Sequence, residues 1–167
     1  MIKTMLATAS DAEAISALLE ANSADRGGML LGHWPREAIE AHIASRQSIV
    51  IATDEQGRLL GALLTSERGF DEAAPVQAML KAWPGGPDAY VYGPVCVAAD
   101  ARGLGVLAAL YAKLQATFPG REAILFIRED NPRSLRAHLG LGMREVARYD
   151  FDGKVFIVLS DRLELAR

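Results

Sequence analysis

A short glycine-containing turn is the part of this sequence best suited to bind a ligand. It reads Arg102-Gly103-Leu104-Gly105 and separates an apolar, strand-like segment from a long apolar helical segment. Glycine lets the backbone come close to a ligand, and the first turn of a helix presents N–H groups without partners inside the helix. Those groups and the positive end of the helix dipole favour an anion such as a pyrophosphate. Arg102 could add a charge-assisted hydrogen bond, although two glycines can also simply end a loop.

The same glycines fit a loose dinucleotide-binding fingerprint, Gly103-x-Gly105-x-x-Ala108, with Glu129 where a ribose-binding acid would stand. Three features count against this interpretation. Five residues separate Val97 from Gly103, whereas the fingerprint places its turn directly after the strand. Only about sixty residues follow the turn, too few for the second half of a doubly wound sheet. The antiparallel hairpin predicted near the end of the chain also has no place in that fold.

The elements around the turn follow from the hydrophobic pattern. Gly93-Pro94 interrupts a predicted strand, and a proline inside a strand requires an edge or a bulge. Asn131-Pro132 is typical of a helix start, and Asp152-Gly153 of a two-residue hairpin turn. In this half of the chain, strands are predicted over 89–98, 123–127, 145–151 and 154–159, and helices over 103–118 and 132–139.

The first half is predicted by the same rules. Ser10 and Glu13 have the spacing of a capping box at the start of a helix. A stripe at helical spacing (Val76, Met79, Leu80 and Trp83) fits either a core or a dimer surface. Strands are predicted over 1–8, 48–53 and 59–65, and helices over 11–21 and from Pro35 onward. The order β-α-α-β-β-(α)-β-α-β-α-β-β predicts an α/β fold, a mixed sheet with helices on its faces.

Length and composition limit the class of protein. The 167 residues predict one domain over 1–167, and 50% hydrophobic with 23% charged residues exclude a wholly disordered chain. No apolar run approaches the ~18–20 residues that cross a bilayer, and the start lacks the features of a secretory signal. One cysteine fits a reducing compartment, and a net charge of −3 argues against phosphate-driven nucleic-acid binding. We therefore expect a soluble cytoplasmic protein with no nucleic-acid or membrane partner.

Two segments together resemble the GNAT superfamily of N-acetyltransferases. Arg102-Gly-Leu-Gly-Val-Leu107 resembles the family's Arg/Gln-x-x-Gly-x-Gly/Ala motif. Asn131-Pro-Arg-Ser-Leu-Arg-Ala-His-Leu-Gly-Leu-Gly-Met143 resembles its Asn-x-x-Ala/Ser-x-x-x-Tyr-x-x-x-Gly-Phe segment. The order of elements from Met1 to Leu159 also matches, and the second half resembles phosphinothricin-type acetyltransferases, which often carry a histidine in place of the tyrosine. Leu107 departs from the family's glycine or alanine, and Met143 from its phenylalanine.

The resemblance implies the GNAT fold: a mixed, mostly antiparallel sheet splayed by a bulge, with helices on both faces. It implies acetyl-coenzyme A as cofactor, and we expect no bound metal. The pyrophosphate would be bound by Arg102, Gly103, Leu104, Gly105, Val106 and Leu107. The pantetheine arm would pair with backbone at Val95 and Val97 beside Cys96, as an added strand does. Contacts with that arm, or an ordered helix start beside it, would come from Asn131, Ser134 and His138.

His138 occupies the position of the family's tyrosine, and we predict it as the general acid. Amine acetylation needs a base for the ammonium proton and an acid for the departing thiolate. A thiol has a pKa near ~8.5, so an imidazole N–H within reach could serve as that acid. Ser134 lies four residues earlier and shares a helical face with it. The alternative is a helix histidine packed near Leu135 and Leu141.

Other candidate residues stay open. The general base could be Glu67, Tyr92 or a water chain, although the first also fits a solvated loop carboxylate and the second a packed strand residue. Cys96 has no histidine near it in sequence, so a core or slot-lining role fits it better than that of a nucleophile. His33 and Trp34 fall in a loop that borders the acceptor pocket in the family. They could contact substrate, or the tryptophan could anchor the loop.

We therefore predict an N-acetyltransferase that moves an acetyl group from acetyl-coenzyme A to a primary amine by direct attack in a ternary complex. Direct attack is preferred because no covalent nucleophile is evident. The expected partner is a small-molecule amine, with a protein N-terminus or lysine as the alternative acceptor, and a homodimer is left open. The hypothesis from a different class is a non-catalytic acyl-coenzyme A-binding sensor or interaction module.

Overall fold

The computed structural model describes residues 1–70 and 73–162, and within them the predicted elements are present. The strands are β1 (Lys3–Leu6), β2 (Ile49–Thr53), β3 (Leu59–Glu67), β4 (Tyr90–Val97), β5 (Ala123–Arg128), β6 (Arg144–Phe151) and β7 (Lys154–Ser160). The α-helices are α1 (Ala12–Ala21), α2 (Arg36–Ala44), α3 (Ala74–Ala82), α4 (Val106–Thr117) and α5 (Pro132–Gly140). Their order along the chain is the predicted one, and their ends differ from the prediction by a few residues.

The seven strands are hydrogen-bonded in the order β1-β2-β3-β4-β5-β7-β6. The β1–β2, β2–β3, β5–β7 and β6–β7 pairs are antiparallel, and β4–β5 is parallel. The predicted mixed, mostly antiparallel sheet is therefore confirmed. The chain divides into two compact units, the first made of Met1–Thr65 and Gly93–Pro119 and the second of Ser66–Tyr92 and Gly120–Arg167.

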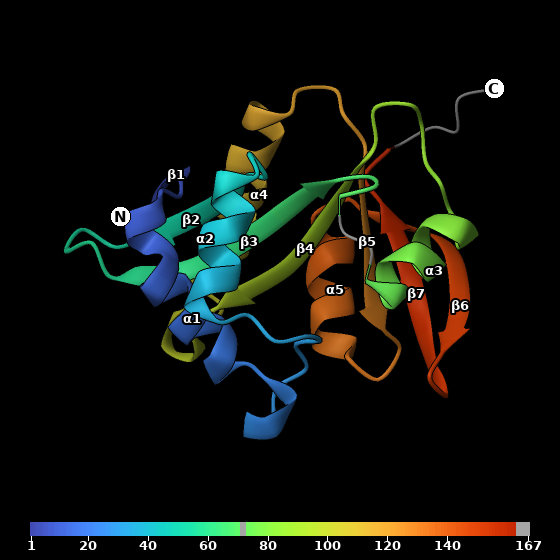
Figure 1. The fold of residues 1–167 in the computed structure, drawn as a ribbon, viewed down its shortest axis with the longest axis horizontal. Helices are drawn as coiled ribbons and strands as arrows, with labels where there is room; N and C mark the ends of the chain where they lie inside the picture. Colours follow the sequence, from blue (N-terminus) through green and yellow to red (C-terminus); the bar gives the residue numbers. More distant parts are fainter. Residues whose placement is uncertain (71–72, 163–167) are drawn as a thin grey trace. The chain divides into compact units, whose positions relative to one another are not determined.

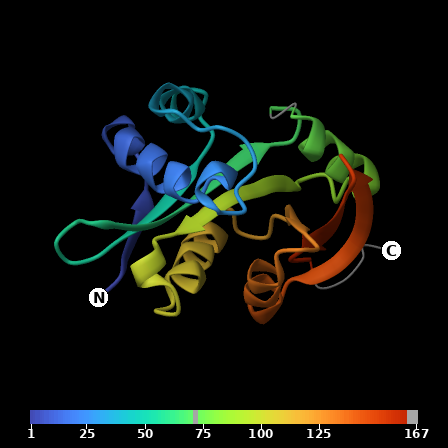
Figure 2. The ribbon, with the colours of Figure 1, turned by 90° about the horizontal axis from the view of Figure 1, so that it is seen from below.

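In the first unit, helices cover both faces of the strands. Helices α1 and α2 pack together on one face of β2 and β3, and α4 contacts β1 and β2 from the other (Figures 1 and 2). Strand β2 is buried along its whole length because both faces are covered. The core of the first unit is formed by buried residues of α1, α2, β2, β3 and β4, namely Ala12, Ile15, Leu19, Ile39, Ile49, Ile51, Ala62, Leu64 and Cys96.

In the second unit, α3 and α5 cover opposite faces of the strands (Figure 2). Successive strand residues point to opposite faces. Val91 packs with Val76 and Met79 of α3, whereas the next residue, Tyr92, contacts His138 of α5. The α3 stripe is core rather than a free surface, since Val76 and Met79 are buried and Leu80 and Trp83 pack against the same cluster.

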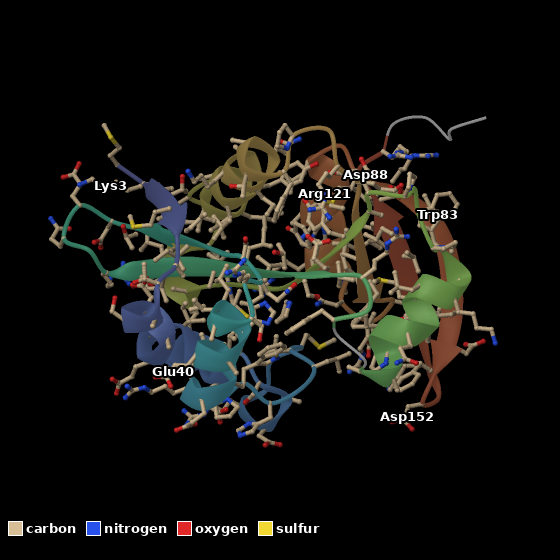
Figure 3. All side chains as sticks on the ribbon, turned by 45° about the horizontal axis from the view of Figure 1, so that its top comes forward. Lys3, Glu40, Trp83, Asp88, Arg121 and Asp152 are labelled. Atoms are coloured by element: carbon tan, nitrogen blue, oxygen red, sulfur yellow. The ribbon has the colours of Figure 1, made fainter. Side chains whose placement is uncertain are left out.

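The last two strands form the predicted hairpin. Phe151 pairs with Lys154, which leaves Asp152-Gly153 as a two-residue turn at the tip labelled in Figure 3. Both turn residues have positive φ, 50° and 73°, as this type of hairpin turn requires. Over residues 1–70 and 73–162, no helix is both long and apolar enough to cross a membrane.

Candidate functional site

The glycine turn before α4 has the geometry of an anion site. Gly103 and Gly105 have φ of 77° and 84°, and Gly105 is the residue that caps the helix. The predicted helix over 103–118 therefore begins only at Val106, because these glycines hold the turn in the left-handed region. The turn is exposed, and Leu104 at its centre is 66% exposed. The backbone N–H groups at the start of α4 therefore lie next to an exposed stretch of backbone, where the two glycines carry no side chain that would block a ligand.

Gly61 in β3 sets the position of this helix start, and the sequence analysis did not identify it. A Cβ atom on Gly61 would lie 2.8 Å from Cγ1 of Val106 and 3.1 Å from the carbonyl oxygen of Cys96. It would also lie 3.1 Å from Cδ1 of Leu110, one turn along α4. The first turns of α4 can approach the strand this closely only because residue 61 has no side chain. An isolated glycine in the apolar run LLGALLT was the available signal.

Two polar contacts tie the glycine turn to distant parts of the first unit. Arg102 donates from Nη2 to Oδ1 of Asn22 at 2.9 Å. Asn22 in turn donates from Nδ2 to the carbonyl oxygen of Leu18 at 2.8 Å, at the end of α1. Before the turn, Arg58 donates to both carboxylate oxygens of Asp100, at 3.1 and 2.9 Å. The guanidinium of Arg102, predicted to meet the pyrophosphate, is therefore held in place by Asn22.

The β4 segment predicted to bind the pantetheine arm lies in the first unit. Ala98, just after Val97, donates its N–H to the carbonyl oxygen of Leu60 at 2.8 Å. Cys96 is buried in the core, and burial raises its pKa to about 12, with a smaller lowering by the charge of Arg102. Its thiol stays protonated near neutral pH, which agrees with a core residue and not with a nucleophile. Gly93 has φ of 117° and the Gly93–Pro94 peptide bond is cis, and the bulge expected here remains a prediction.

In the second unit, Asn131 is confirmed as the cap of α5. Its side-chain oxygen accepts a hydrogen bond from the backbone N–H of Ser134 at 3.4 Å, and Pro132 follows at the first helical position. Both features were expected from the sequence because asparagine caps and first-turn prolines act locally.

His138 is buried, with 2% of its surface exposed, and both of its ring nitrogens have partners. Nδ1 lies 2.8 Å from the carbonyl oxygen of Ser134, and 3.4 Å from the Ser134 hydroxyl. Nε2 lies 2.9 Å from the hydroxyl oxygen of Tyr92, whose ring meets the imidazole edge-on at 5.4 Å. Since a carbonyl oxygen only accepts, Nδ1 carries the hydrogen. Nε2 of the neutral ring is then an acceptor, and Tyr92 is the donor.

Burial keeps this imidazole neutral. It lowers the pKa of His138 below its ordinary value, and the hydrogen bond with the Ser134 backbone opposes that shift. The sequence analysis placed Ser134 beside His138 through the helical spacing. It did not pair Tyr92 with His138, because the two residues are 46 positions apart. The predicted acid and one predicted base candidate are therefore hydrogen-bonded to each other.

Glu67, the other base candidate, is occupied by an ion pair. Arg121 donates from Nη1 and Nη2 to its two carboxylate oxygens, at 2.9 and 2.7 Å. These hydrogen bonds lower the pKa of Glu67, which makes its carboxylate a weaker base. Arg121 also donates from Nε to the carbonyl oxygen of Asp88 at 2.8 Å, and Figure 3 shows these two residues beside each other. This network fixes the loop that leads into β4.

His33 and Trp34 in the α1–α2 loop have different surroundings. His33 is exposed, with its Nδ1 4.0 Å from Oε2 of Glu20. Trp34 is half-buried against the core of the first unit and lies edge-on to His42 at 6.1 Å. Its carbonyl oxygen accepts a hydrogen bond from the Ser16 hydroxyl at 2.7 Å. These contacts favour the interpretation of Trp34 as the anchor of the loop.

Comparisons with solved structures identify the fold. No family model matches the sequence, and no curated protein matches it either. A candidate phosphinothricin N-acetyltransferase is 18% identical, with a TM-score of 0.69 over 99% of this chain and 100% of its own. The acetyltransferase candidate yncA from Salmonella typhimurium, solved with its cofactor acetyl-coenzyme A, is 15% identical, with a TM-score of 0.70 over 100% and 96%. The ribosomal-protein-S18-alanine N-acetyltransferase from Escherichia coli is 14% identical, with a TM-score of 0.69 over 100% and 97%.

Other similar structures are named as GNAT-family acetyltransferases, among them one from Bacillus cereus. The chain thus has the GNAT fold over nearly its whole length, as its two motifs predicted.

Proposed function

We propose that this protein is an acetyl-coenzyme A-dependent N-acetyltransferase whose acceptor is a primary amine of a small molecule. The observation that carries the proposal is the exposed Gly103–Gly105 turn at the start of α4, in a chain with the GNAT fold. We further propose that residues 1–167 act as a single cytoplasmic N-acetyltransferase domain, of which 71–72 and 163–167 lie outside the described residues.

The donor would be bound by the residues that the two motifs predicted. The backbone N–H groups from Gly103 to Leu107 would bind the pyrophosphate, with Arg102 beside them. Support comes from the positive φ of both glycines and from the helix start that follows them. The pantetheine arm would pair with Val95 and Val97 beside Cys96, and Asn131, Ser134 and His138 would contact it or order the start of α5.

The chemistry would be direct attack of the amine on the thioester. Attack forms the C–N bond, breaks the C–S bond and leaves a thiolate that needs a proton. Cys96 does not favour a covalent route, because its thiol is buried and stays protonated. His138 would supply the acid function, as predicted for the position of the family's tyrosine.

The acceptor is assigned by analogy with similar proteins. One of them is named for phosphinothricin and another for the alanine of a ribosomal protein. The α1–α2 loop, which would border the acceptor, is anchored by Trp34 and carries an exposed His33. We propose a small-molecule amine, with a protein N-terminus or lysine as the competing acceptor.

The test is thermal unfolding with acetyl-coenzyme A, NAD or NADP, followed by turnover with a panel of amines. A ligand at a hundred times its Kd adds ~2.7 kcal/mol to the stability of the folded form, or roughly 5 °C or more in Tm for a chain of this size. We expect a shift with acetyl-coenzyme A alone. No shift, or a shift with NAD instead, would overturn the proposal. Binding without turnover on any amine or peptide would favour the acyl-coenzyme A-binding sensor.

A matched pair of variants locates the binding site. Leu104 is 66% exposed at the centre of the turn, so its substitution should leave folding intact. Leu104→Asp places a negative charge where the pyrophosphate would bind, and Leu104→Asn has nearly the same shape without the charge. We expect the Kd for acetyl-coenzyme A to rise about tenfold or more for the aspartate variant relative to the asparagine variant, and less at high salt. Equal Kd values would exclude this turn as the phosphate site.

A further inference from the structure

Arg102 of the glycine turn is exposed and has a neutral hydrogen-bond partner. Its Nη2 donates to Oδ1 of Asn22 at 2.9 Å. Across residues 1–70 and 73–162, no carboxylate forms an ion pair with this guanidinium. Arg58, by contrast, donates to both carboxylate oxygens of Asp100. The positive charge of Arg102 is therefore not compensated by its partner, and it remains able to attract an anion.

Asn22 is held so that its amide oxygen faces Arg102. Its Nδ2 donates to the carbonyl oxygen of Leu18 at 2.8 Å, and since a carbonyl oxygen only accepts, the other end of the amide is the oxygen. The backbone of Asn22 is fixed as well. Its N–H donates to the carbonyl oxygen of Leu19 at 3.0 Å, and its own carbonyl oxygen accepts from the N–H of Leu30 at 3.2 Å. The end of α1 thus presents a fixed acceptor to the guanidinium.

A neutral acceptor suits an arginine that has to bind a phosphate. An exposed arginine without a partner samples many rotamers, and ordering it on binding costs free energy. The hydrogen bond with Asn22 restricts these rotamers in advance. A guanidinium has five N–H donors in a planar fork, so one bond to Asn22 leaves donors for phosphate oxygens.

Resting on the proposed acetyl-coenzyme A binding, we propose that Asn22 is a positioning residue, which holds the Arg102 guanidinium ready for the pyrophosphate of the donor. Asn22 acts through Arg102 and does not itself contact the donor. Asn22, Arg102 and the Gly103–Gly105 turn all belong to the first unit. Substitutions of Asn22 should therefore change the affinity for the donor and leave kcat at saturating donor unchanged.

The test compares Asn22→Leu with Asn22→Asp in the full chain. Both side chains have nearly the shape of asparagine and both lose the hydrogen bond to Leu18, but only aspartate adds a negative charge beside Arg102. We expect the Kd for acetyl-coenzyme A to rise about threefold to tenfold in the leucine variant, because Arg102 is no longer ordered. It should be about tenfold higher again in the aspartate variant, with a smaller difference at high salt. A wild-type Kd in folded Asn22→Leu, or equal Kd values for the two variants, would overturn the proposal.

A second measurement separates positioning from a purely structural role. In an Arg102→Ala background, Asn22→Leu should leave the Kd for acetyl-coenzyme A unchanged, because the group that it positions is absent. S-acetylpantetheine carries the thioester without the pyrophosphate, so its kcat/KM should be the same for wild type and Asn22→Leu. An equal loss with both donors, or an undiminished effect without Arg102, would show that Asn22 only supports the fold.

The same measurements distinguish this inference from the proposed function. A wild-type protein that does not bind acetyl-coenzyme A overturns both. A wild-type protein that binds it, with a Kd that is insensitive to Asn22, overturns only the positioning role.

Discussion

The substitution Gly61→Ala tests how the fold positions the glycine turn. The added methyl group would stand 2.8 Å from Cγ1 of Val106, the first residue of α4, and 3.1 Å from the carbonyl oxygen of Cys96. Ordinary carbon–carbon contact begins near ~3.5 Å, so the Val106 side chain must retreat by roughly 0.7 Å. The backbone oxygen of Cys96, on the other side, cannot move independently of β4. Because Val106 directly follows Gly105, the strain falls on the proposed phosphate site.

The size of the effect follows from overpacking. Extra carbon in a packed core costs ~1–3 kcal/mol, partly offset by ~0.4–1 kcal/mol from the stiffer unfolded chain. We therefore expect the free energy of unfolding to fall by about 1–2 kcal/mol in urea titrations. A shift of the α4 start should also raise the Kd for acetyl-coenzyme A several-fold, since about 1.4 kcal/mol corresponds to a factor of ten.

Two further variants make this prediction specific. Gly140→Ala adds the same methyl group at the end of α5, where nothing lies within 4 Å, and should be neutral or slightly stabilising. Val106→Ala in the Gly61→Ala background removes the atom that clashes. The double variant should therefore lose less stability than the sum of the two single changes. A Gly61→Ala protein as stable as wild type, or strictly additive losses, would refute the reasoning.

Three more predictions concern residues of each unit. Asn22→Ala removes the hydrogen-bond acceptor of Arg102, and we expect the free energy of unfolding in urea to fall by ~1 kcal/mol or less. Adding Arg102→Ala to this variant should lower the free energy of unfolding no further, because the hydrogen bond is already lost. Cys96 should resist a thiol reagent at pH 8 in the folded protein and react on unfolding, because its thiol is buried with a pKa near 12. Burial makes the pKa of His138 lower in the folded chain than in the unfolded chain. The neutral imidazole therefore contributes its full stabilisation above pH ~6.5, and the free energy of unfolding should fall as the pH drops below that value. In acid-unfolding curves, His138→Gln should lose this pH dependence.

The elements that could be predicted from the sequence are those specified by neighbouring residues. The hairpin at Asp152-Gly153, the α5 cap at Asn131 and the glycine turn all depend on residues within a few positions of one another. The mixed, mostly antiparallel sheet could also be anticipated, because the motifs are those of a known fold and lie in its order.

One local prediction was wrong in its residues. The capping box expected from Ser10 and Glu13 is formed by Thr8 and Asp11, whose carboxylate accepts from the Thr8 N–H at 2.8 Å. The physical reason is a short 3₁₀ turn over Ala9–Asp11 that precedes α1. The capping pair belongs to that turn, two residues before the expected position, and the spacing rule alone does not distinguish two overlapping candidates.

Candidate site residues could be named from the sequence, but their partners could not. Arg102 was assigned to a phosphate from its place in a motif, whereas its guanidinium is held by Asn22, 80 residues away. Glu67 was considered as a base, but Arg121, 54 residues away, holds its carboxylate and lowers its pKa. Such pairings depend on which strands become neighbours, and the local sequence carries no information about that.

His138 shows why the partner decides the chemistry. Its position in a motif predicts an acid, since an imidazole can carry a proton on either nitrogen. The Ser134 carbonyl fixes that proton on Nδ1, which turns Nε2 into an acceptor. The parallel pairing of β4 with β5, Tyr90 with Ala123, sets the place of Tyr92 in the second unit, where its hydroxyl meets Nε2. In the folded chain, Nε2 of His138 is therefore the acceptor for a tyrosine hydroxyl that the motif alone does not identify.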